Sequence, residues 1–381
     1  MLVGGKGTRL RPLTLSAPKP LLPTAGLPFL AHQLARAAEC GITHVVLATS
    51  YRAEMFTEAF GDGGQFGLSI DYEYESVPLG TGGGIRNAAA RLHGGPDDPI
   101  VVLNGDILSG HDLPAQVDLH RKADAAVTLH LVPVDDPSRY GCVPTDGSSR
   151  VTAFLEKTPN PVTNQINAGC YVFRRSVIDQ IPAGQVVSVE RQTFPGLIEA
   201  EAVVMGYAEN AYWLDVGTPE AFVQGSCDLV LGTLPSTVLP GPAGQSLVLG
   251  EARVASDARL SHGTTIGERA VVEAGAIVEG SVVFDGATIG AGAVVRNSIV
   301  GYGATIAGAS NVDDVSVRAA AIDGVVIGDG AYVGPGNELL RGLRLWPGMR
   351  LEPTSVRFST DALYQLTADR AVVSRPASDT R

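Results

Sequence analysis

Aliphatic residues recur at intervals of six positions through the last third of the chain. A repeat of this length is typical of a parallel β-helix, in which each aliphatic side chain stacks on its counterpart one coil along. A β-sandwich with frequent turns is the alternative. We therefore expect a left-handed parallel β-helix over residues 250–358. The repeat consists of Val254, Leu260, Ile266, Val272, Val278, Val283, Ile289, Val295, Val300, Ile306, Val312, Ile327, Val333, Leu339, Leu345 and Leu351.

Two segments beside this repeat lack its period. Residues 232–249 are rich in proline and glycine, which indicates a linker. Residues 359–381 end in small and polar side chains, which indicates a C-terminal tail. The chain is therefore expected to consist of a first domain over 1–231, a linker, the β-helix and a tail.

Residues 1–231 alternate between helical and strand-like patterns. Such alternation predicts a Rossmann-like α/β domain, in which helices cover both faces of a mostly parallel sheet. Ligands of such sheets bind at the carboxyl ends of strands. Only Leu2 and Val3 precede the first glycines, although a core strand usually has ~5–6 residues, so the first strand is shortened or the true start lies upstream. The expected helices span 29–40, 53–60, 83–92 and 113–122, and the expected strands 44–48, 70–74, 100–103 and 125–132.

The first twenty residues contain a glycine-rich loop beside basic side chains. Three glycines in four residues allow a sharp turn and a close approach to a ligand, because no Cβ stands in the way. Consecutive free N–H groups in such a turn suit phosphate oxygens. The loop is not a P-loop, because Gly7 follows Lys6. It is not a dinucleotide fingerprint either, because Leu10 replaces the third glycine. We expect it to bind a polyphosphate.

Two aspartates are candidate metal ligands. Asp106 closes a Leu-Asn-Gly-Asp segment after an apolar run, and Asp215 lies within Trp-Leu-Asp-Val-Gly-Thr-Pro. A carboxylate at the carboxyl end of a strand suits Mg²⁺, which prefers oxygen ligands and accompanies phosphates. A single Asp before a turn is more often a turn former. The two residues are far apart in the chain, so only the fold can bring them together.

A second glycine-rich turn spans residues 77–84. Glycines permit flat stacking of a purine ring on the backbone, and free amides can read the edge of the ring. On its own such a segment is more often a tight turn than a site. Its position after the first loop favours a nucleotide base as its ligand.

These segments resemble the signatures of the sugar-nucleotide pyrophosphorylases, nucleotidyltransferases that join a nucleoside triphosphate to a sugar-1-phosphate. The first loop matches G-G-x-G-T-R-L-x-P-L-T and P-K-P, and the second turn matches P-L-G-T-x-G. The resemblance implies that Arg9 and Lys19 are catalytic and that Asp106 and Asp215 bind Mg²⁺. It also implies that the nucleotide is bound by Leu2, Gly4, Gly5, Gly7, Thr8, Pro78, Gly80, Thr81 and Gly82.

Further segments resemble the family's Y-G-x-V, F-x-E-K and N-A-G elements, which bind the sugar phosphate. The resemblance implies that Glu156 and Asn167 hold sugar hydroxyls and that Lys157 holds the phosphate. Gly105 and Gly141 would also contact this substrate. An S-x-E segment at 188–190 is expected to cap a helix and support the site.

Within the family, this set of motifs is most similar to guanylyltransferases that act on mannose-1-phosphate. GTP and mannose-1-phosphate are therefore the favoured substrates. The sugar phosphate would attack the α-phosphorus in line, with no protein nucleophile. Adenylyl- or thymidylyltransferases for glucose-1-phosphate and guanylyltransferases for a heptose or cyclitol phosphate remain alternatives. Alternatives of other classes are a non-catalytic regulatory subunit and a bifunctional enzyme whose β-helix transfers acyl groups.

Composition limits the possible partners and compartment. A net charge of −12 argues against a general nucleic-acid binder. No apolar run reaches the ~20 residues of a membrane helix, and no signal peptide is recognisable. The cysteines are far apart and form no C-x-x-C, which is typical of a reduced cytoplasmic protein. The flat coils of a β-helix suit the stacking of subunits, so a homo-oligomer is expected.

Overall fold

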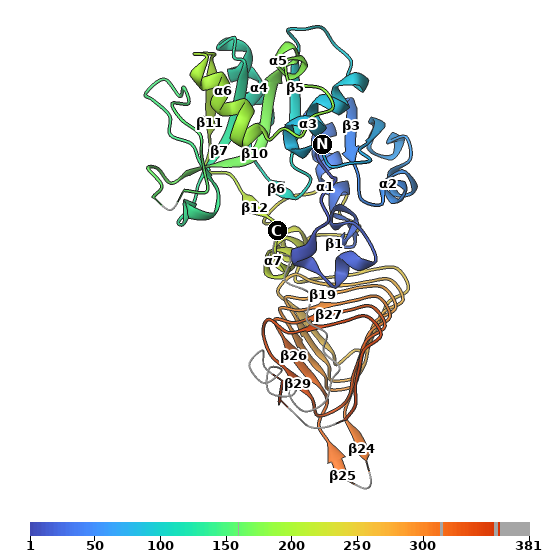
Figure 1. The fold of residues 1–381 in the computed structure, drawn as a ribbon. Helices are drawn as coiled ribbons and strands as arrows, with labels where there is room; N and C mark the ends of the chain where they lie inside the picture. The colour runs from blue at the N-terminus through green and yellow to red at the C-terminus, as the bar shows by residue number, and fades with distance from the viewer. Residues whose placement is uncertain (159, 313–314, 354–356, 359–381) are drawn as a thin grey trace.

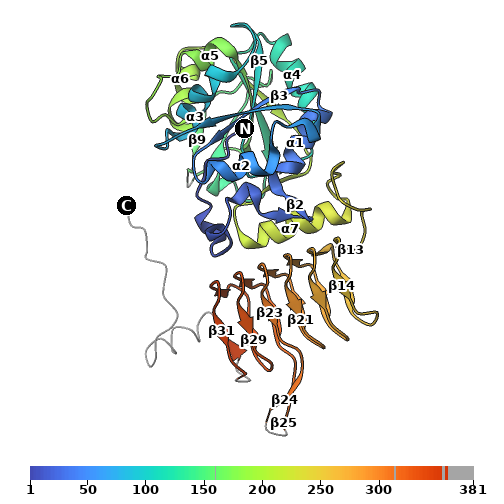
Figure 2. The ribbon, with the colours of Figure 1, turned by 90° about the vertical axis from the view of Figure 1, so that its right-hand side faces the viewer.

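The computed structural model describes residues 1–158, 160–312, 315–353 and 357–358. Figure 1 shows an α/β domain above a stack of short strands, and helix α7 (Pro219–Leu231) lies between the two. Figure 2 shows this helix running along the upper face of the stack. The tail expected over 359–381 lies outside the described residues.

The α/β domain contains the expected elements, with most bounds within two residues of those expected. The strands that complete its sheet, β10 and β11, follow later in the chain. The helices are α1 (Phe29–Glu39), α2 (Ala53–Phe60), α3 (Gly80–Ala88), α4 (Leu113–Lys122), α5 (Arg175–Asp179) and α6 (Phe194–Glu199). The strands are β1 (Pro23–Thr24), β2 (Leu27–Pro28), β3 (His44–Thr49), β4 (Ser69–Tyr74), β5 (Pro99–Leu103), β6 (Ile107–Ser109), β7 (Val127–Pro133), β8 (Gly141–Cys142), β9 (Leu155–Glu156), β10 (Gln165–Arg174), β11 (Val204–Ala208) and β12 (Trp213–Asp215).

Helices cover both faces of the central sheet, as expected. Figure 2 shows α3, α5 and α6 on one side and α1 and α4 on the other. Parallel pairing holds for β3 with β4 and for β7 with β11. Strand β10 runs antiparallel to both β5 and β7, so the sheet is mixed at this strand.

The N-terminal residues occupy the middle of this sheet despite their small number. Leu2 forms parallel bridges to Ala48 and Asn104, and so connects the end of β3 to the end of β5. The α-amino group of Met1 donates a hydrogen bond to the carbonyl of Val46 at 2.8 Å, and burial lowers the pKa of this amine to about 5. The glycine loop therefore begins directly at the carboxyl ends of two strands.

Helix α3 begins earlier than expected. The periodicity places its start at residue 83, but the helix begins at Gly80 and ends at Ala88, and a 3-10 turn follows over Ala89–Arg91. Its glycines are packed rather than free: a Cβ on Gly80 or Gly82 would lie within 3.0 Å of atoms of Val187. Close packing against a neighbouring segment, which the sequence does not reveal, explains the glycines within a helix.

The C-terminal strands form three parallel sheets, consistent with the left-handed β-helix that the six-residue period predicts. Every repeat residue from Ile266 to Leu345 whose side chain is described is buried. One face consists of β13 (Ser246–Val248), β16 (Thr264–Ile266), β19 (Val282–Val283), β22 (Ile299–Val300), β27 (Val326–Ile327) and β30 (Arg344–Leu345). The second consists of β14 (Arg253–Val254), β17 (Val271–Val272), β20 (Thr288–Ile289), β23 (Thr305–Ile306), β28 (Tyr332–Val333) and β31 (Arg350–Leu351). The third consists of β15 (Arg259–Ser261), β18 (Ile277–Glu279), β21 (Val294–Arg296), β26 (Ala321–Asp323), β29 (Glu338–Leu339) and β32 (Arg357–Phe358).

Two details differ from the expected pattern. Strand β13 lies within the range expected to be a linker, and it pairs with β16 as part of the first coil. Val312 is not a coil position, because strands β24 (Ser310–Val312) and β25 (Val315–Val317) form an antiparallel hairpin. The hairpin interrupts the coil between β23 and β28, which still pair directly with each other.

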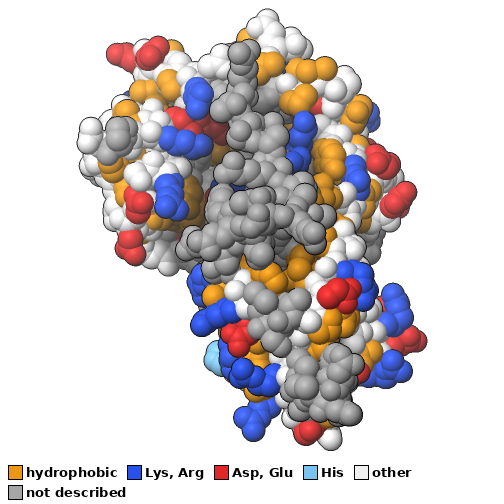
Figure 3. Space-filling view, turned by 60° about the horizontal axis from the view of Figure 1, so that its bottom comes forward, with side chains coloured by type: hydrophobic (Ala, Val, Ile, Leu, Met, Phe, Trp, Pro, Cys, Tyr) orange, Lys and Arg blue, Asp and Glu red, His pale blue; other side chains and the backbone are white. Residues whose placement is uncertain are grey.

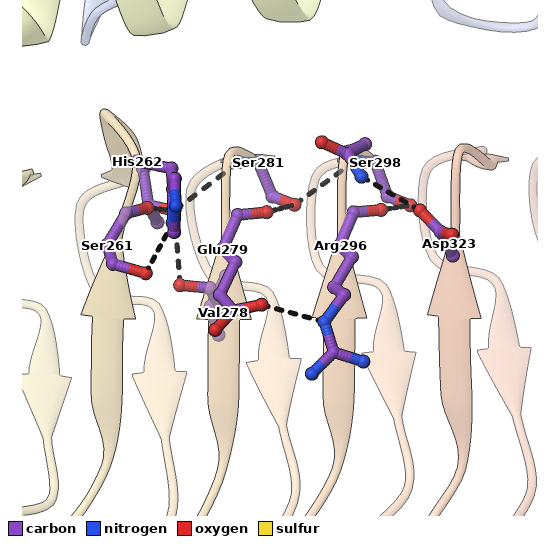
Figure 4. Close-up of polar contacts among 10 residues, drawn as sticks. Ser261, His262, Val278, Glu279, Ser281, Arg296, Ser298 and Asp323 are labelled. Atoms are coloured by element: carbon purple, nitrogen blue, oxygen red, sulfur yellow. Dashed lines mark hydrogen bonds and ion pairs between the residues drawn. The ribbon is translucent and has the colours of Figure 1, made fainter.

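Buried hydroxyls connect successive coils at one corner of the β-helix (Figure 4). The hydroxyl of Ser281 donates to the carbonyl of Glu279 at 2.8 Å and accepts from the amide of Ser298 at 3.1 Å. Thr264 and Ser298 repeat this arrangement in the neighbouring coils, and all three are fully buried. Because a buried amide without a partner is costly, these hydroxyls stabilise the turn of each coil.

The β-helix surface is charged, whereas its upper face is apolar. Figure 3 shows acidic and basic side chains over the β-helix, and ion pairs such as Arg296–Glu279 link adjacent coils. On the upper face, Phe284 shares one hydrophobic core with α7 and with Leu10 and Leu13 of the N-terminal loop. The β-helix therefore supports the segment that carries the glycine loop.

Candidate active site

A cleft of about 530 Å³ opens at the carboxyl ends of the strands. It contains most of the expected site residues, which come from three separate parts of the chain: the first loop, the second glycine-rich turn and the segment that ends at Asp106. Because these segments meet only in the fold, their convergence is independent support for one common ligand. Among the expected residues, the lining includes Leu2, Gly4, Gly5, Gly7, Thr8, Arg9, Lys19, Pro78, Gly80, Thr81, Gly105 and Asp106.

The first loop takes a conformation that favours glycine at two positions. Gly7 has a φ of 58°, and a Cβ there would lie 3.0 Å from both Lys19 and Thr14. A Cβ on Gly4 would lie 2.8 Å from the hydroxyl of Ser50, which itself donates to the carbonyl of Gly4. The amides of this loop therefore lie at the cleft without side chains to cover them, as a phosphate site requires.

The second turn lies across the cleft from the first loop and is held from behind. The hydroxyl of Thr81 donates to the carboxylate of Glu190 at 2.8 Å, and Ser188 donates to the same oxygen at 2.6 Å. Ser188 also accepts from the amide of Arg191, so the expected cap is confirmed. The amide of Gly82 donates to Val187 at 2.8 Å, and Gly82 does not line the cleft. Its contact with a nucleotide remains a prediction.

Asp106 directly precedes β6 and Asp215 is the last residue of β12, and these two strands pair antiparallel. The pairing of β6 with β12 sets Asp215 opposite Ile107, and the amide of Val216 donates to the carbonyl of Asp106 at 2.9 Å. The ammonium of Lys19 lies 3.0 Å from the carboxylate of Asp106. Only 10% of the Lys19 side chain is exposed, so Asp106 is the partner of a nearly buried cation.

Asp215 carries the feature that best fits a metal ion. Its Oδ1 is buried and has no hydrogen-bond partner in the described part of the chain. Burial, with the nearby charge of Asp106, raises the pKa of Asp215. A buried, unpaired carboxylate oxygen beside a second carboxylate suits Mg²⁺, which binds one or two carboxylates together with substrate phosphates. The described residues contain no group of three acidic, His or Cys side chains that could hold a metal without a substrate.

Arg9 lies beside the segment that follows Asp215. Its guanidinium lies flat on the backbone of Gly217, where an added Cβ would be 2.9–3.0 Å from three guanidinium atoms. Arg9 is exposed, and it is close enough to Asp215 to lower the pKa of that carboxyl, against the larger effect of burial. Arg9, Lys19 and Asp106 therefore line the cleft, and Asp215, which is not part of the lining, lies close enough for their charges to affect its pKa.

Of the residues expected to bind a sugar phosphate, Gly105 lines this cleft and the other four lie outside its lining. Gly141 and Glu156 face each other across β8 and β9, and Lys157 lies 3.7 Å from Glu156 with an exposed side chain. The amide nitrogen of Asn167 donates to the hydroxyl of Tyr171 at 2.9 Å. Lys157 is close enough to Asp215 to influence its pKa. The roles of these four residues remain predictions.

Two residues that the sequence did not single out also belong to the site. Glu75 lines the cleft, and its carboxylate accepts from the amide of Leu79 at 3.2 Å. Its position between an expected strand and the second glycine turn could have identified it. Gln33 of α1 contacts the segment that carries Asp106. No sequence pattern distinguishes Gln33 from any other polar residue of a helix.

The remaining sequence expectations concern cysteines and membrane helices. All four cysteines are free, and three of them are buried. Within the described ranges, no helix has the length and apolar character needed to cross a membrane.

Comparison with known proteins agrees with this geometry. A family profile described as Nucleotidyl transferase matches residues 1–230, and one described as GMPPB C-terminal domain matches residues 243–336. The mannose-1-phosphate guanylyltransferase of Mycobacterium tuberculosis is 57% identical over 267 residues, which cover 70% of this chain and 74% of the relative. The mannose-1-phosphate guanylyltransferase catalytic subunit beta of Drosophila pseudoobscura pseudoobscura is 37% identical over 273 residues, 70% of this chain and 71% of the relative.

Solved structures agree on the first domain. HddC from Yersinia pseudotuberculosis complexed with GMP-PN is 28% identical, with a TM-score of 0.51 over 59% of this chain and 96% of that chain. The first profile spans more than half of the sequence and includes every cleft residue described above. The chain therefore belongs to the nucleotidyl transferase family, and its second part is a GMPPB C-terminal domain.

Proposed function

We propose that the protein is a mannose-1-phosphate guanylyltransferase, which converts GTP and mannose-1-phosphate to GDP-mannose and pyrophosphate. The relatives named above carry this activity in their names, and one of them is 57% identical to this chain. The observation that carries the proposal is the cleft, which brings the polyphosphate loop, a purine-type turn and Asp106 together, with Asp215 on the strand that pairs beside Asp106. Retention of Arg9, Lys19 and both aspartates favours a catalytic chain over a regulatory one.

The mechanism follows from the charges in the cleft. An oxygen of mannose-1-phosphate attacks the α-phosphorus of GTP, and the bond to the β-phosphate oxygen breaks as the new bond forms. No protein nucleophile is needed, because the incoming phosphate is already an anion. The protein positions the two substrates and offsets the charge that develops on the phosphoryl oxygens. Arg9 and Lys19 neutralise the departing pyrophosphate.

Asp106 and Asp215 would hold a Mg²⁺ ion in this reaction. A bound Mg²⁺ offsets negative charge on the phosphates and restricts their orientation. The buried, unpaired oxygen of Asp215 supports this role. Glu156, Lys157 and Asn167 would bind the sugar phosphate at the margin of the cleft. We further propose that the protein is cytoplasmic and that the β-helix mediates assembly of a homo-oligomer.

Pyrophosphate release from each of four nucleoside triphosphates, tested with a panel of hexose-1-phosphates, measures the reaction directly. We expect GTP with mannose-1-phosphate to have a kcat/KM at least tenfold above every other pair. Higher activity with ATP or dTTP and glucose-1-phosphate would contradict the proposal and favour the second family reaction. Absence of turnover with every pair would favour a regulatory subunit.

Glu75 provides a test of the base. Guanine presents two neighbouring donors, N1–H and the N2 amine, which suit a carboxylate, whereas adenine presents an acceptor at N1. Because hydrogen bonds to a charged group contribute roughly 1.5–3 kcal/mol, we expect Glu75→Gln to lower kcat/KM for GTP about ten- to a hundredfold. Inosine triphosphate, which lacks the N2 amine, should lose much less.

The ratio of GTP to inosine triphosphate activity therefore measures the contact itself. Glu73→Gln is the matched control, because Glu73 pairs with Arg91 outside the cleft. An unchanged ratio in the Glu75 variant would show that another group reads the base.

Gly217 provides a steric test of Arg9. Its φ is not in the left-handed region, so alanine fits the backbone, but the new Cβ would displace the guanidinium. We expect Gly217→Ala to lower kcat about tenfold with little change in melting temperature, because the displaced group is the end of a flexible side chain. In an Arg9→Ala background the same change should have little effect, since interacting residues are not additive. An equal loss of kcat in both backgrounds would show that Gly217→Ala does not act through Arg9.

A further inference from the structure

The turn at 104–107, which carries Asp106, is held by hydrogen bonds to several of its backbone groups. The amide of Asn104 donates to Gly169, and the amide of Gly105 donates to Leu2, both at 2.9 Å. The carbonyl of Asp106 accepts from Val216, as described above. The carbonyls of Asn104 and Ile107 stand on either side of the Gly105-Asp106 pair.

A single side chain binds both of these carbonyls. The amide nitrogen of Gln33 donates to the carbonyl of Asn104 at 3.0 Å and to that of Ile107 at 2.6 Å. Because both partners are acceptors, the NH₂ group and not the oxygen must face them. The Oε1 of Gln33 is buried and has no hydrogen-bond partner within the described ranges. The side chain therefore gives up one possible hydrogen bond and keeps the two to the turn.

The position of Gln33 makes this contact rigid. Gln33 lies on α1, where Leu30 and Leu34 on either side are fully buried. Helix α1 thus places the amide against the backbone of the turn, whereas the ammonium of Lys19 contacts the Asp106 carboxylate. One group fixes the two ends of the turn, and the other contacts the carboxylate that the turn presents.

We propose that Gln33 is a positioning residue that sets the Asp106 carboxylate for Mg²⁺ together with the nucleotide. The inference rests on the proposed role of Asp106 as a metal ligand. Groups that orient a metal ligand without touching the metal commonly change metal affinity or activity 10–100-fold when removed. Loss of Gln33 should therefore raise the Mg²⁺ requirement of the reaction and not only weaken the fold.

Two substitutions of Gln33 test this role. Gln33→Met keeps the approximate shape of the side chain but removes both donors. Gln33→Glu sets a carboxylate oxygen against two carbonyls and should disturb the turn more. We expect the Mg²⁺ concentration for half-maximal rate to rise at least tenfold in Gln33→Met and further in Gln33→Glu, with a smaller change in KM for mannose-1-phosphate.

Gln116 offers a matched control elsewhere in the same domain. Its amide nitrogen donates to the carbonyls of Thr128 at 3.1 Å and Cys170 at 3.5 Å, and the residue is fully buried. Gln116→Met should lower the melting temperature at least as much as Gln33→Met, because its oxygen also loses partners. It should leave the Mg²⁺ requirement unchanged, since Gln116 does not touch the turn.

A binding measurement separates this inference from the proposed reaction. Mn²⁺ is titrated by electron paramagnetic resonance in the presence of the α,β-methylene analogue of GTP, which does not react. We expect the Kd of Mn²⁺ to be at least tenfold weaker in Gln33→Met than in the native protein or in Gln116→Met. An unchanged Kd and Mg²⁺ requirement in both Gln33 variants would overturn the role of Gln33.

Failure of the proposed function has a different signature. If Asp106→Asn binds Mn²⁺ as tightly as the native protein, Asp106 is not a ligand and the premise fails. If the native protein binds Mn²⁺ with the analogue but releases no pyrophosphate from any pair of substrates, the reaction is wrong while the comparison of Gln33 with Gln116 still holds.

Discussion

Replacing Arg9 by alanine should lower turnover at least a hundredfold and leave the fold intact. The guanidinium can pair with two phosphate oxygens at once, and such charge-assisted contacts are strong. Removing one preformed contact to a developing negative charge commonly costs about 3–4 kcal/mol of transition-state stabilisation, or roughly two to three factors of ten in rate. The fold should tolerate the change, because Arg9 is exposed and its guanidinium lies against the backbone of Gly217.

Single-turnover rates and melting temperatures of the native protein and Arg9→Ala measure the two expectations separately. Arg9→Lys should recover part of the rate, because it restores the charge but not the planar fork. Lys6→Ala is the matched control: Lys6 belongs to the same loop and carries the same charge, but it is not part of the cleft lining. Near-normal turnover in Arg9→Ala, or an equal loss in Lys6→Ala, would remove Arg9 from the mechanism.

The sequence predicts the elements of this protein better than their contacts. The six-residue repeat determines the β-helix almost alone, because the period leaves few other ways to bury aliphatic side chains on one side. The repeat misassigns Val312, where the β24–β25 hairpin is inserted. The insertion leaves the pairing of β23 with β28 intact but interrupts the six-residue spacing in the sequence. Helices with a clear apolar face, such as α1 and α4, agree with the expected bounds.

Secondary-structure prediction is wrong where a glycine is required by packing against a distant segment. Glycine normally disfavours a helix, yet α3 begins at Gly80, before the expected start at residue 83. Here Val187 and Gln185 lie too close to permit a Cβ on Gly80 or Gly83. Packing of distant segments therefore overrides the local preference, and a single sequence does not contain that information.

In the candidate site too, the sequence predicts which residues take part but not which contacts they make. Resemblance to family motifs identifies Arg9, Lys19 and both aspartates, because their residue types carry the chemistry. It cannot state that Lys19 pairs with Asp106 or that β6 and β12 bring the aspartates together. The sequence alone does not identify Gln33, because its role depends on the direction of two backbone carbonyls in the turn that carries Asp106.

The two aspartates should respond to substitution with equal losses of activity but opposite changes in stability. Either Asp→Asn change should lower kcat at least a thousandfold, because a metal bridging the phosphates supplies several kcal/mol. The stability effects differ because the partners differ. Asp106 neutralises Lys19, which is nearly buried, whereas the Oδ1 of Asp215 is buried and has no hydrogen-bond partner among the residues that the structure describes.

The direction of the stability change in Asp215→Asn follows from the pKa of Asp215. Burial raises the pKa of Asp215 above its value in the unfolded chain. Its contribution to stability is therefore present below the unfolded pKa and is lost as the pH rises through the folded pKa. At neutral pH the ionised carboxylate destabilises the metal-free protein. Asparagine cannot ionise, so Asp215→Asn should raise the melting temperature in the absence of metal, and the gain should shrink as the pH falls.

Asp106→Asn should lower the melting temperature, because it removes the carboxylate that pairs with the ammonium of Lys19, whose side chain is only 10% exposed. Removing one partner of a poorly solvated ion pair destabilises strongly. Melting curves in EDTA at several pH values, for the native protein and both variants, measure the contrast. If Asp215→Asn melts below the native protein at neutral pH, Asp215 makes a stabilising contact and the reason for assigning it to a metal is lost. If Asp215→Asn melts above the native protein and is inactive, the carboxylate of Asp215 lowers the stability of the native protein but is required for activity, as expected of a metal ligand.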